Sequence, residues 1–259
     1  MTRALVTGAG HRLGRAISLY LGERGYDVAV HYNSSSAGAD EVVAALSEMG
    51  RRGVALQANL LDEDATTSLL PRAAEALGGP ITCLVNNASI FEYDTVSTAT
   101  AESWDRHIGS NLRAPFILTQ AMAAQELAPA NDGVGEPIST GLIVNMVDQR
   151  VLKLTPEFIT YTIAKMGLWA MTRTTAQALA PAIRVNAIGP GPTLRGGRQT
   201  EEHFSTQRSK TVLERGSNPA DITGAVGYFL DAPAVTGQLI CTDGGQHLGW
   251  QTPDVLGVE

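Results

Sequence analysis

The sequence predicts a single α/β domain built on a doubly wound, parallel sheet of about seven strands with helices on both faces. Three observations lead to this prediction. Short runs rich in Val, Ile and Leu alternate with amphipathic stretches, an order typical of parallel strands joined by helices. The strand segments are apolar throughout rather than alternating, as expected where both faces of a sheet are buried. A glycine-rich turn, Gly8 to Gly14, follows the first of these runs.

The predicted elements follow one another in a regular order that begins βαβαβ. Strands are expected at 3–7, 27–32, 53–58, 81–86, 141–147 and 183–188. Between them lie helices expected near 13–24, 37–50, 63–77, 102–128 and 157–180. The stretch 129–140 is rich in Pro and Gly and predicts one long surface loop. Since no linker or repeat interrupts the chain, we expect one domain over 1–259.

Composition limits the possible classes of function. The 259 residues are 44% hydrophobic and 17% charged, which suits one large core and argues against disorder, collagen and coiled coil. The net charge of -7, without a basic stripe, argues against nucleic acid as a partner. No run of 18 apolar residues and no signal-peptide pattern occurs, so we expect a cytoplasmic protein without a membrane partner. Two cysteines and scattered histidines predict neither a disulfide framework nor a metal site.

The glycine turn, Thr7-Gly-Ala-Gly-His-Arg-Leu-Gly14, lies where the first strand meets the first helix. Glycines let the backbone approach a pyrophosphate, whose charge the helix N-terminus then stabilises. A tight turn needs small residues without any ligand as well, but its place in a βαβ unit favours the dinucleotide site of a Rossmann domain. Arg12 brings a fixed positive charge where a third glycine is expected. The turn contributes five residues to the predicted cofactor site: Gly8, His11, Arg12, Leu13 and Gly14.

The turn after the second strand bears on the choice between NAD and NADP. An acid there would bind the ribose hydroxyls of NAD and repel a 2′-phosphate, but no acid occurs before Asp40. Hydroxyl and amide donors suit a phosphate and favour NADP(H), although no Arg or Lys is present and a Ser-rich turn is also an ordinary way to begin a helix. The expected cofactor residues in this turn are His31, Tyr32, Asn33, Ser34 and Ser35.

Tyr161 and Lys165 are four residues apart on a predicted helix and therefore share a face. We expect the ammonium of Lys165 to lower the pKa of the Tyr161 phenol, which would make the phenol a better proton donor. The alternative is a chance pair on a solvated helix, and the other motifs decide between the two.

Six motifs together resemble the short-chain dehydrogenase/reductase family, in the family's order and over nearly the whole chain. They are the glycine turn, Asn86-Asn87-Ala88, Asn111, Tyr161-x-x-x-Lys165, Pro190-Gly191 and Asp243-Gly244-Gly245. The resemblance implies a reductase in which Asn111, Tyr161 and Lys165 are catalytic, with Asn111 supporting a water-linked proton path. It implies a homotetramer built on the helices near 102–128 and 157–180. It also implies cofactor contacts from Asn59, Asn87, Ala88, Ser89, Tyr161, Lys165, Pro190 and Gly191.

Two departures from the general family pattern resemble its pteridine reductase branch. Most members have a serine 13 residues before the tyrosine to polarise a carbonyl, and this chain has Asp148 there, together with Arg12 in the glycine turn. Phe91 stands where that branch has a ring that stacks on the pterin, and further likeness comes from N-M-V-D at 145–148 and R-S-K-x-x-L-x-R at 208–215. The alternatives are that Asp148 caps a loop, Arg12 is a surface side chain and Phe91 belongs to the core.

This branch implies NADPH-dependent reduction of a C=N bond in a pterin or a dihydrofolate-like compound. Tyr161 would donate the proton, and Lys165 and Asp148 would adjust the acidity of the Tyr161 hydroxyl. A carbonyl reductase acting on a ketone or a 3-oxoacyl compound is the alternative, and the intact Tyr/Lys/Asn set argues against a non-enzymatic dinucleotide sensor. The substrate would be bound by Arg12, Ser89, Phe91, Asp148, Tyr161 and Leu194, with a substrate loop near 193–215 completing the pocket.

Overall fold

The computed structural model describes residues 2–197 and 199–252. Its core is a seven-stranded sheet with the order β3-β2-β1-β4-β7-β8-β9, in which every neighbouring pair is parallel. The doubly wound sheet predicted from the sequence is therefore confirmed. The strands are β1 (Arg3–Val6), β2 (Asp27–Tyr32), β3 (Gly53–Gln57), β4 (Cys83–Asn86), β7 (Gly141–Met146), β8 (Ile183–Pro190) and β9 (Leu239–Thr242).

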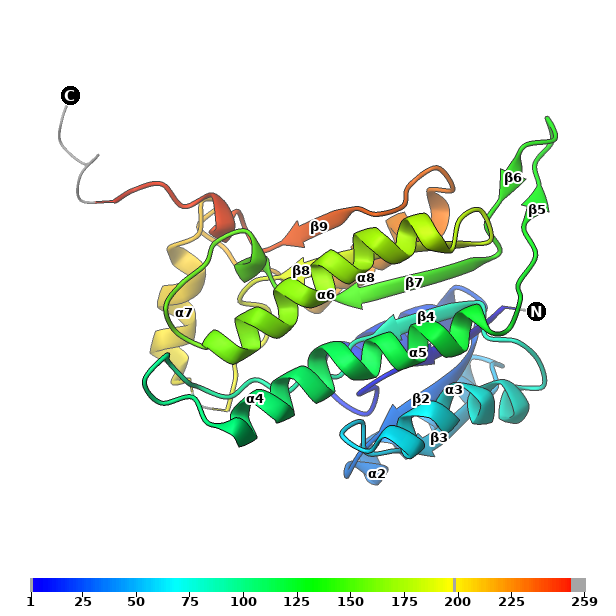
Figure 1. Cartoon of the computed structure of the whole chain (residues 1–259), viewed down its shortest axis with the longest axis horizontal. Helices are drawn as coiled ribbons and strands as arrows, with labels where there is room; N and C mark the ends of the chain where they lie inside the picture. Colours follow the sequence, from blue (N-terminus) through cyan, green and yellow to red (C-terminus); the bar gives the residue numbers. More distant parts are fainter. Residues whose placement is uncertain (1, 198, 253–259) are drawn as a thin grey trace.

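Helices cover both faces of the sheet (Figure 1). One face packs against α1 (Arg12–Glu23), α2 (Ser36–Glu48) and α8 (Pro219–Asp231), and the other packs against α3 (Glu63–Leu77), α5 (Ala114–Ala123) and α6 (Ile159–Ala178). Successive strand residues alternate between these two cores, since Val28 and Val30 belong to the first and Ala29 to the second. Both faces of the sheet are therefore buried, which explains the continuous apolar character of the strand sequences.

The helices expected near 102–128 and 157–180 differ most from their predicted bounds. The helix expected near 102–128 consists of α4 (Ala101–Ile108), a π-helical turn (Gly109–Arg113) and α5, which ends at Ala123. The helix expected near 157–180 begins only at Ile159, because Phe158 has a left-handed backbone with φ of 55°. Wide π turns of this kind frequently occur at functional sites.

Several elements of the structure were not specified by the sequence prediction. Of the seven strands expected, six had named positions, and β9 is the seventh. The stretch after β8 contains α7 (Glu201–Ser209) and α8. The loop expected at 129–140 contains a short hairpin, β5 (Ala130–Asn131) and β6 (Pro137–Ile138), which projects from the end of the molecule opposite α7 (Figure 1).

Strand order reverses between β1 and β4, and the carboxyl ends of these strands are where doubly wound sheets bind ligands. Within 2–197 and 199–252, no helix is long and apolar enough to cross a membrane. The same residues contain no cluster of His, Cys, Asp or Glu side chains that could hold a metal ion.

Candidate active site

The glycine turn is bound tightly to the segment that follows β4. Thr7 Oγ1 accepts the N–H groups of Asn87 and Ala88, both at 2.9 Å, and Asn87 Nδ2 donates to the Thr7 carbonyl at 2.8 Å. A Cβ at Gly14 would lie 2.1 Å from the Gly8 carbonyl oxygen, and Gly8 itself has φ of +62°. The two glycines therefore allow a backbone approach that no side chain permits, as a pyrophosphate cradle requires.

The start of α1 has the properties of an anion site. Its N-cap residue, His11, makes no side-chain capping bond, so the first N–H groups of the helix are not satisfied from there. Such groups, together with the helix dipole, stabilise a phosphate. The partly buried side chain of Leu13 packs against the neighbouring core.

The turn after β2 lies against the glycine turn. A Cβ at Gly10 would meet the Ser35 carbonyl oxygen at 3.3 Å. Asn33 and Ser34 are exposed at the carboxyl end of β2, and Tyr32 and Ser35 are partly exposed. Hydroxyl and amide groups therefore border the glycine turn on this side.

His31 is positioned differently from its predicted role as a cofactor contact. Its ring is 1% exposed. Nδ1 accepts the Gly8 N–H at 3.0 Å, and Nε2 lies 3.1 Å from the Ala58 carbonyl, to which it donates in the matching tautomer. The imidazole thus joins the glycine turn to the end of β3, and burial lowers the pKa of His31 to about 4.

We expect His31 to make the protein sensitive to acid. An unfolded histidine titrates near pH 6.5, whereas the folded ring stays neutral down to about pH 4. The unfolded chain therefore binds more protons in this window, and the free energy of unfolding falls as the pH falls. Between about pH 7 and about pH 5, the titration of His31 lowers the free energy of unfolding by on the order of 2 kcal/mol. Denaturant titrations of wild type and His31→Gln at both pH values measure it: the variant should lose about 2 kcal/mol less, and an equal loss would contradict the assignment.

A line of buried polar side chains fixes α6 relative to the sheet. Asn86 Nδ2 at the end of β4 donates to Asn145 Oδ1 on β7 at 2.8 Å, and Asn145 Nδ2 donates to Thr172 Oγ1 on α6 at 2.9 Å. All three residues are buried, so these bonds are costly to break. They place the helix that carries Tyr161 and Lys165 against the carboxyl ends of β4 and β7.

Tyr161 and Asp148 form a direct pair at the carboxyl end of β7. The Tyr161 hydroxyl donates to Asp148 Oδ2 at 2.8 Å. Asp148 Oδ1 accepts the Arg150 N–H at 2.8 Å and caps a short 3-10 turn, Gln149–Val151. The capping interpretation of Asp148 is therefore confirmed for Oδ1, and its functional role through Oδ2 stays a prediction.

The electrostatics of Tyr161 contradict the sequence prediction. Burial, followed by the charge and hydrogen bond of Asp148, raises the phenol pKa well above 10, and Arg150 and Ser89 offset part of this effect. Lys165 Nζ donates to the Met146 carbonyl at 2.7 Å and lies 5.6 Å from the centre of the Tyr161 ring. Burial lowers the pKa of Lys165 to about 8. The expected lowering of the Tyr161 pKa is wrong, because burial and the Asp148 carboxylate raise it. The Lys165 ammonium donates to a strand carbonyl, and the phenol keeps its proton at neutral pH.

Asn111 lies fully buried in the π-helical turn, and its amide binds one residue at both ends. Nδ2 donates to the Ile90 carbonyl at 2.8 Å, and Oδ1 accepts the Ile90 N–H at 2.9 Å. Ile90 directly precedes Phe91, so Asn111 holds the segment that carries this ring. Its part in a water-linked proton path stays a prediction.

Phe91 belongs to an exposed aromatic surface rather than to the core. Its side chain is 45% exposed. The ring stacks on Phe158, with centroids 4.4 Å apart, and its edge contact with Tyr161 has centroids 4.7 Å apart. Tyr93 packs edge-on against Phe158, and the Arg150 guanidinium lies 5.1 Å from the centre of the Phe158 ring. An exposed ring beside the Tyr161 phenol is suited to a flat aromatic ligand.

A buried hydrogen-bond chain supports this aromatic surface from three segments. The Glu92 N–H donates to His107 Nε2 at 3.1 Å, His107 Nδ1 lies 2.7 Å from Thr160 Oγ1, and the Thr160 hydroxyl donates to Asp94. Burial lowers the pKa of His107, so the ring is neutral and one nitrogen can accept while the other donates. Phe158 and His107 were missed in the sequence because their partners lie on distant segments and neither belongs to a motif.

Arg12 joins the glycine turn to the predicted substrate loop. Its backbone has φ of 50°, the left-handed conformation that glycine adopts without strain. Nη1 donates to the Arg195 carbonyl at 2.8 Å, and Nη2 donates to the Leu194 carbonyl at 2.9 Å. Arg12 is exposed, but it is not a free surface side chain, because its guanidinium is bonded to these two carbonyls. A guanidinium has five N–H donors, so Arg12 can hold the loop and still meet an anion.

The remaining predicted residues lie at the same edge of the sheet. Ser89 is exposed beside Tyr161. Pro190 ends β8, and a Cβ at Gly191 would lie 2.6 Å from the Cβ of Asp243, so only glycine fits there. Asn59 is exposed after β3, where its Oδ1 accepts the Leu61 N–H at 3.1 Å.

Comparisons with known proteins show what the chain as a whole is similar to. The family model described as Enoyl-(Acyl carrier protein) reductase matches residues 8–247. The structure of FolM alternative dihydrofolate reductase 1 from Brucella suis, in complex with NADP, is similar at 43% identity and a TM-score of 0.90, covering 98% of both chains. The NADP-bound angucycline C-6 ketoreductase LanV is similar at 31% identity and a TM-score of 0.83, covering 96% of both chains. The 3-oxoacyl-[acyl-carrier-protein] reductase FabG of Staphylococcus epidermidis is 30% identical over 250 residues, covering 95% of this chain and 98% of FabG.

Proposed function

The chain belongs to the short-chain dehydrogenase/reductase family, and from this premise we propose that it reduces a C=N bond of a dihydropterin or dihydrofolate-like substrate with NADPH. The observation that carries the proposal is the bond between the Tyr161 hydroxyl and the Asp148 carboxylate, next to the exposed ring of Phe91. The likeness to a dihydrofolate reductase of this family at 43% identity supports it.

The residues present fit a bound NADPH. The glycine cradle excludes side chains where the pyrophosphate would lie, the start of α1 would stabilise its charge, and Asn33 and Ser34 would donate to the 2′-phosphate. When bound, NADPH supplies the hydride that the carbon of the C=N bond accepts.

Tyr161 and Asp148 would supply the proton that the ring nitrogen needs. The raised pKa of Tyr161 keeps its proton in place at neutral pH, 2.8 Å from Asp148 Oδ2. When this proton passes to the substrate nitrogen, a phenolate is left beside the Asp148 carboxylate, and the two negative charges would repel each other. Asp148 would therefore take up a proton from solvent and pass it to the phenolate across the same hydrogen bond, so that each turnover consumes one proton from solvent. A serine at this position could orient a ketone oxygen but has no comparable acidic proton.

We expect NADPH to bind more tightly than NADH, by about tenfold or more, because hydrogen bonds to a charged 2′-phosphate are worth more than those to a hydroxyl. The sequence between His31 and Ser36 contains no acid that would repel the phosphate. Fluorescence titrations with both cofactors measure the ratio. Asn33→Asp, which places a carboxylate in the exposed turn, should reduce or reverse the preference. Equal affinities in the wild-type protein would contradict the assignment of this turn.

A carbonyl reductase is the second candidate, favoured by the likeness to a ketoreductase and to a 3-oxoacyl reductase. In that enzyme Tyr161 would protonate the carbonyl oxygen, and Asp148 would act mainly as a cap through Oδ1. The two candidates share cofactor and proton donor, so only the substrate separates them. NADPH oxidation against 7,8-dihydrofolate, a 7,8-dihydropterin and a 3-oxoacyl thioester decides between them: turnover of the ring substrates supports the proposal, and turnover of the thioester alone replaces it.

We also propose that the chain forms a homotetramer through the face made by α4, α5 and α6. Trp104, Phe116, Ile163 and Met166 on these helices are between 38% and 46% exposed, which is unusual for large apolar side chains on one face. Light scattering of the purified protein should give four times the chain mass, and Phe116→Glu with Ile163→Glu should lower it. A wild-type monomer would contradict the proposal.

A further inference from the structure

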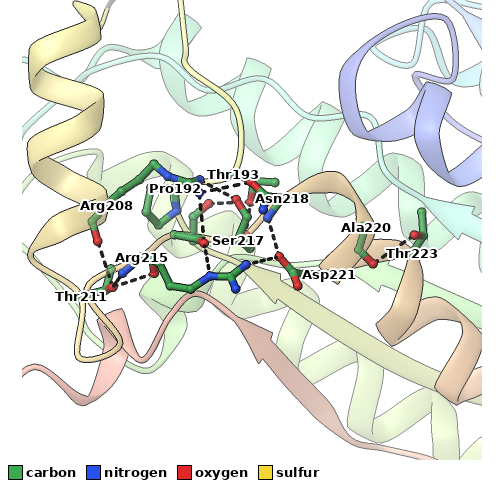
Figure 2. A network of polar contacts seen from close by, with 12 residues as sticks. Pro192, Thr193, Arg208, Thr211, Arg215, Ser217, Asn218, Ala220, Asp221 and Thr223 are labelled. Atoms are coloured by element: carbon green, nitrogen blue, oxygen red, sulfur yellow. Dashed lines mark hydrogen bonds and ion pairs between the residues drawn. The ribbon is translucent and has the colours of Figure 1, made fainter.

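A single arginine at the centre of the substrate loop binds both ends of that loop. Arg208, on α7, donates from Nη1 to the carbonyls of Pro192 at 2.8 Å and Ser217 at 2.6 Å. Its Nη2 donates to the Gly216 carbonyl and to Asn218 Oδ1, both at 3.2 Å. Figure 2 shows this guanidinium between Pro192 on one side and Ser217 and Asn218 on the other. Because Pro192 follows β8 and Asn218 caps α8, the Arg208 side chain connects the two ends of the loop.

The surroundings of Arg208 are shaped for this arrangement. A Cβ at Gly216 would lie 2.2 Å from the Pro192 carbonyl oxygen, so the two backbone segments can approach this closely only because residue 216 is glycine. The hydroxyls of Thr193 and Ser217 are hydrogen-bonded to each other beside the guanidinium. The Phe204 ring centre lies 5.4 Å from Arg208 Cζ, which further restricts the side chain. A planar fork can serve several carbonyls at once, whereas a lysine ammonium is a point charge.

The same loop is held at a second point by Arg12. The carbonyls of Leu194 and Arg195, which accept the Arg12 guanidinium, stand two and three residues after Pro192. Arg208 thus sets the start of the short segment that positions Arg12.

We propose that Arg208 is a positioning residue for substrate binding. By holding Pro192 against Gly216 and Ser217, it places the Leu194 and Arg195 carbonyls where they keep the Arg12 guanidinium beside the glycine turn. Arg208 acts through Arg12, whose contact with substrate belongs to the proposed function. Arg208 is the first arginine of the R-S-K-x-x-L-x-R segment, so the proposal assigns this motif a function in substrate binding.

The state of the loop can be measured without any substrate. Trypsin cleavage after the exposed Arg195, followed by mass spectrometry, should be about tenfold faster in Arg208→Met than in wild type, since several hydrogen bonds to a charged group are lost. Lys210→Met, which removes the same charge from an exposed position at the end of α7, is the matched control and should cleave at the wild-type rate. Arg208→Lys keeps the charge without the fork and should resemble Arg208→Met. An unchanged rate in Arg208→Met, or a wild-type rate in Arg208→Lys, would overturn the proposal.

A double-mutant cycle then separates positioning from general stabilisation. With 7,8-dihydrofolate, or with the 3-oxoacyl thioester if the panel selects it, Arg208→Met should raise KM about tenfold with a smaller change in kcat. Arg12→Met should raise KM as well, and the double variant should be no worse than the poorer single variant, because both changes remove one linked function. Additive effects would show that Arg208 only stabilises the loop and would overturn the proposal. The cleavage assay needs no substrate, so it tests the inference even if the enzyme reduces neither compound. Failure of the proposed function is therefore distinguishable from failure of this inference.

Discussion

Tyr161→Phe is expected to lower kcat by about 10²- to 10⁴-fold, the usual contribution of a general acid, and to leave NADPH affinity nearly unchanged. The variant removes only the hydroxyl that donates to Asp148 Oδ2, while the buried ring and its contact with Phe91 remain. Steady-state rates with 7,8-dihydrofolate and a fluorescence titration with NADPH measure the two effects.

Tyr228→Phe is the matched control, because it removes a phenol hydroxyl from a side chain that is 52% exposed on α8. This control should keep the wild-type rate. If Tyr161→Phe retained more than about half of the rate, the loss would be far too small for a general acid. The proton donor would then have to be another group, with Asp148 the nearest candidate.

Asp148→Ser is expected to lower kcat/KM for the dihydropterin by about 10²-fold or more, and to lower any ketone reduction much less. The substitution removes the carboxyl group that can return a proton to Tyr161, but a serine at this position can orient a carbonyl oxygen. The fold should tolerate the change, because a serine hydroxyl can replace Asp148 Oδ1 as the cap for the Arg150 N–H. Rates with both substrate classes and a melting curve measure selectivity and stability separately.

Asp148→Asn sharpens this test, because the amide keeps the shape and the capping oxygen of Asp148 and loses its exchangeable acid proton. It should resemble Asp148→Ser with the dihydropterin. A well-folded Asp148→Ser protein with an unchanged dihydropterin rate would mean that Asp148 is only a cap, and the carbonyl reductase would become the better assignment.

Much of the architecture could be predicted because its signals are local in the chain. Strand positions followed from apolar runs, and six predicted strands correspond to β1, β2, β3, β4, β7 and β8 in the sheet. The missed strand, β9, is four residues long and partly buried throughout, so it has neither a long apolar run nor a clear alternation. The division of the helix near 102–128 depends on the π turn around Asn111, whose side chain is paired with Ile90 on another segment.

Local sequence signals were enough to predict the doubly wound fold, the edge of the sheet where the cofactor is expected and the side chains gathered there, because glycine spacing and helical periodicity act over a few residues. The contacts of those side chains depended instead on how the elements pack. The buried ring of His31 joins Gly8 to Ala58, and Lys165 Nζ donates to the Met146 carbonyl. Hydrogen-bond partners and pKa values depend on burial and on groups distant in the chain, and these are settled only when the elements pack.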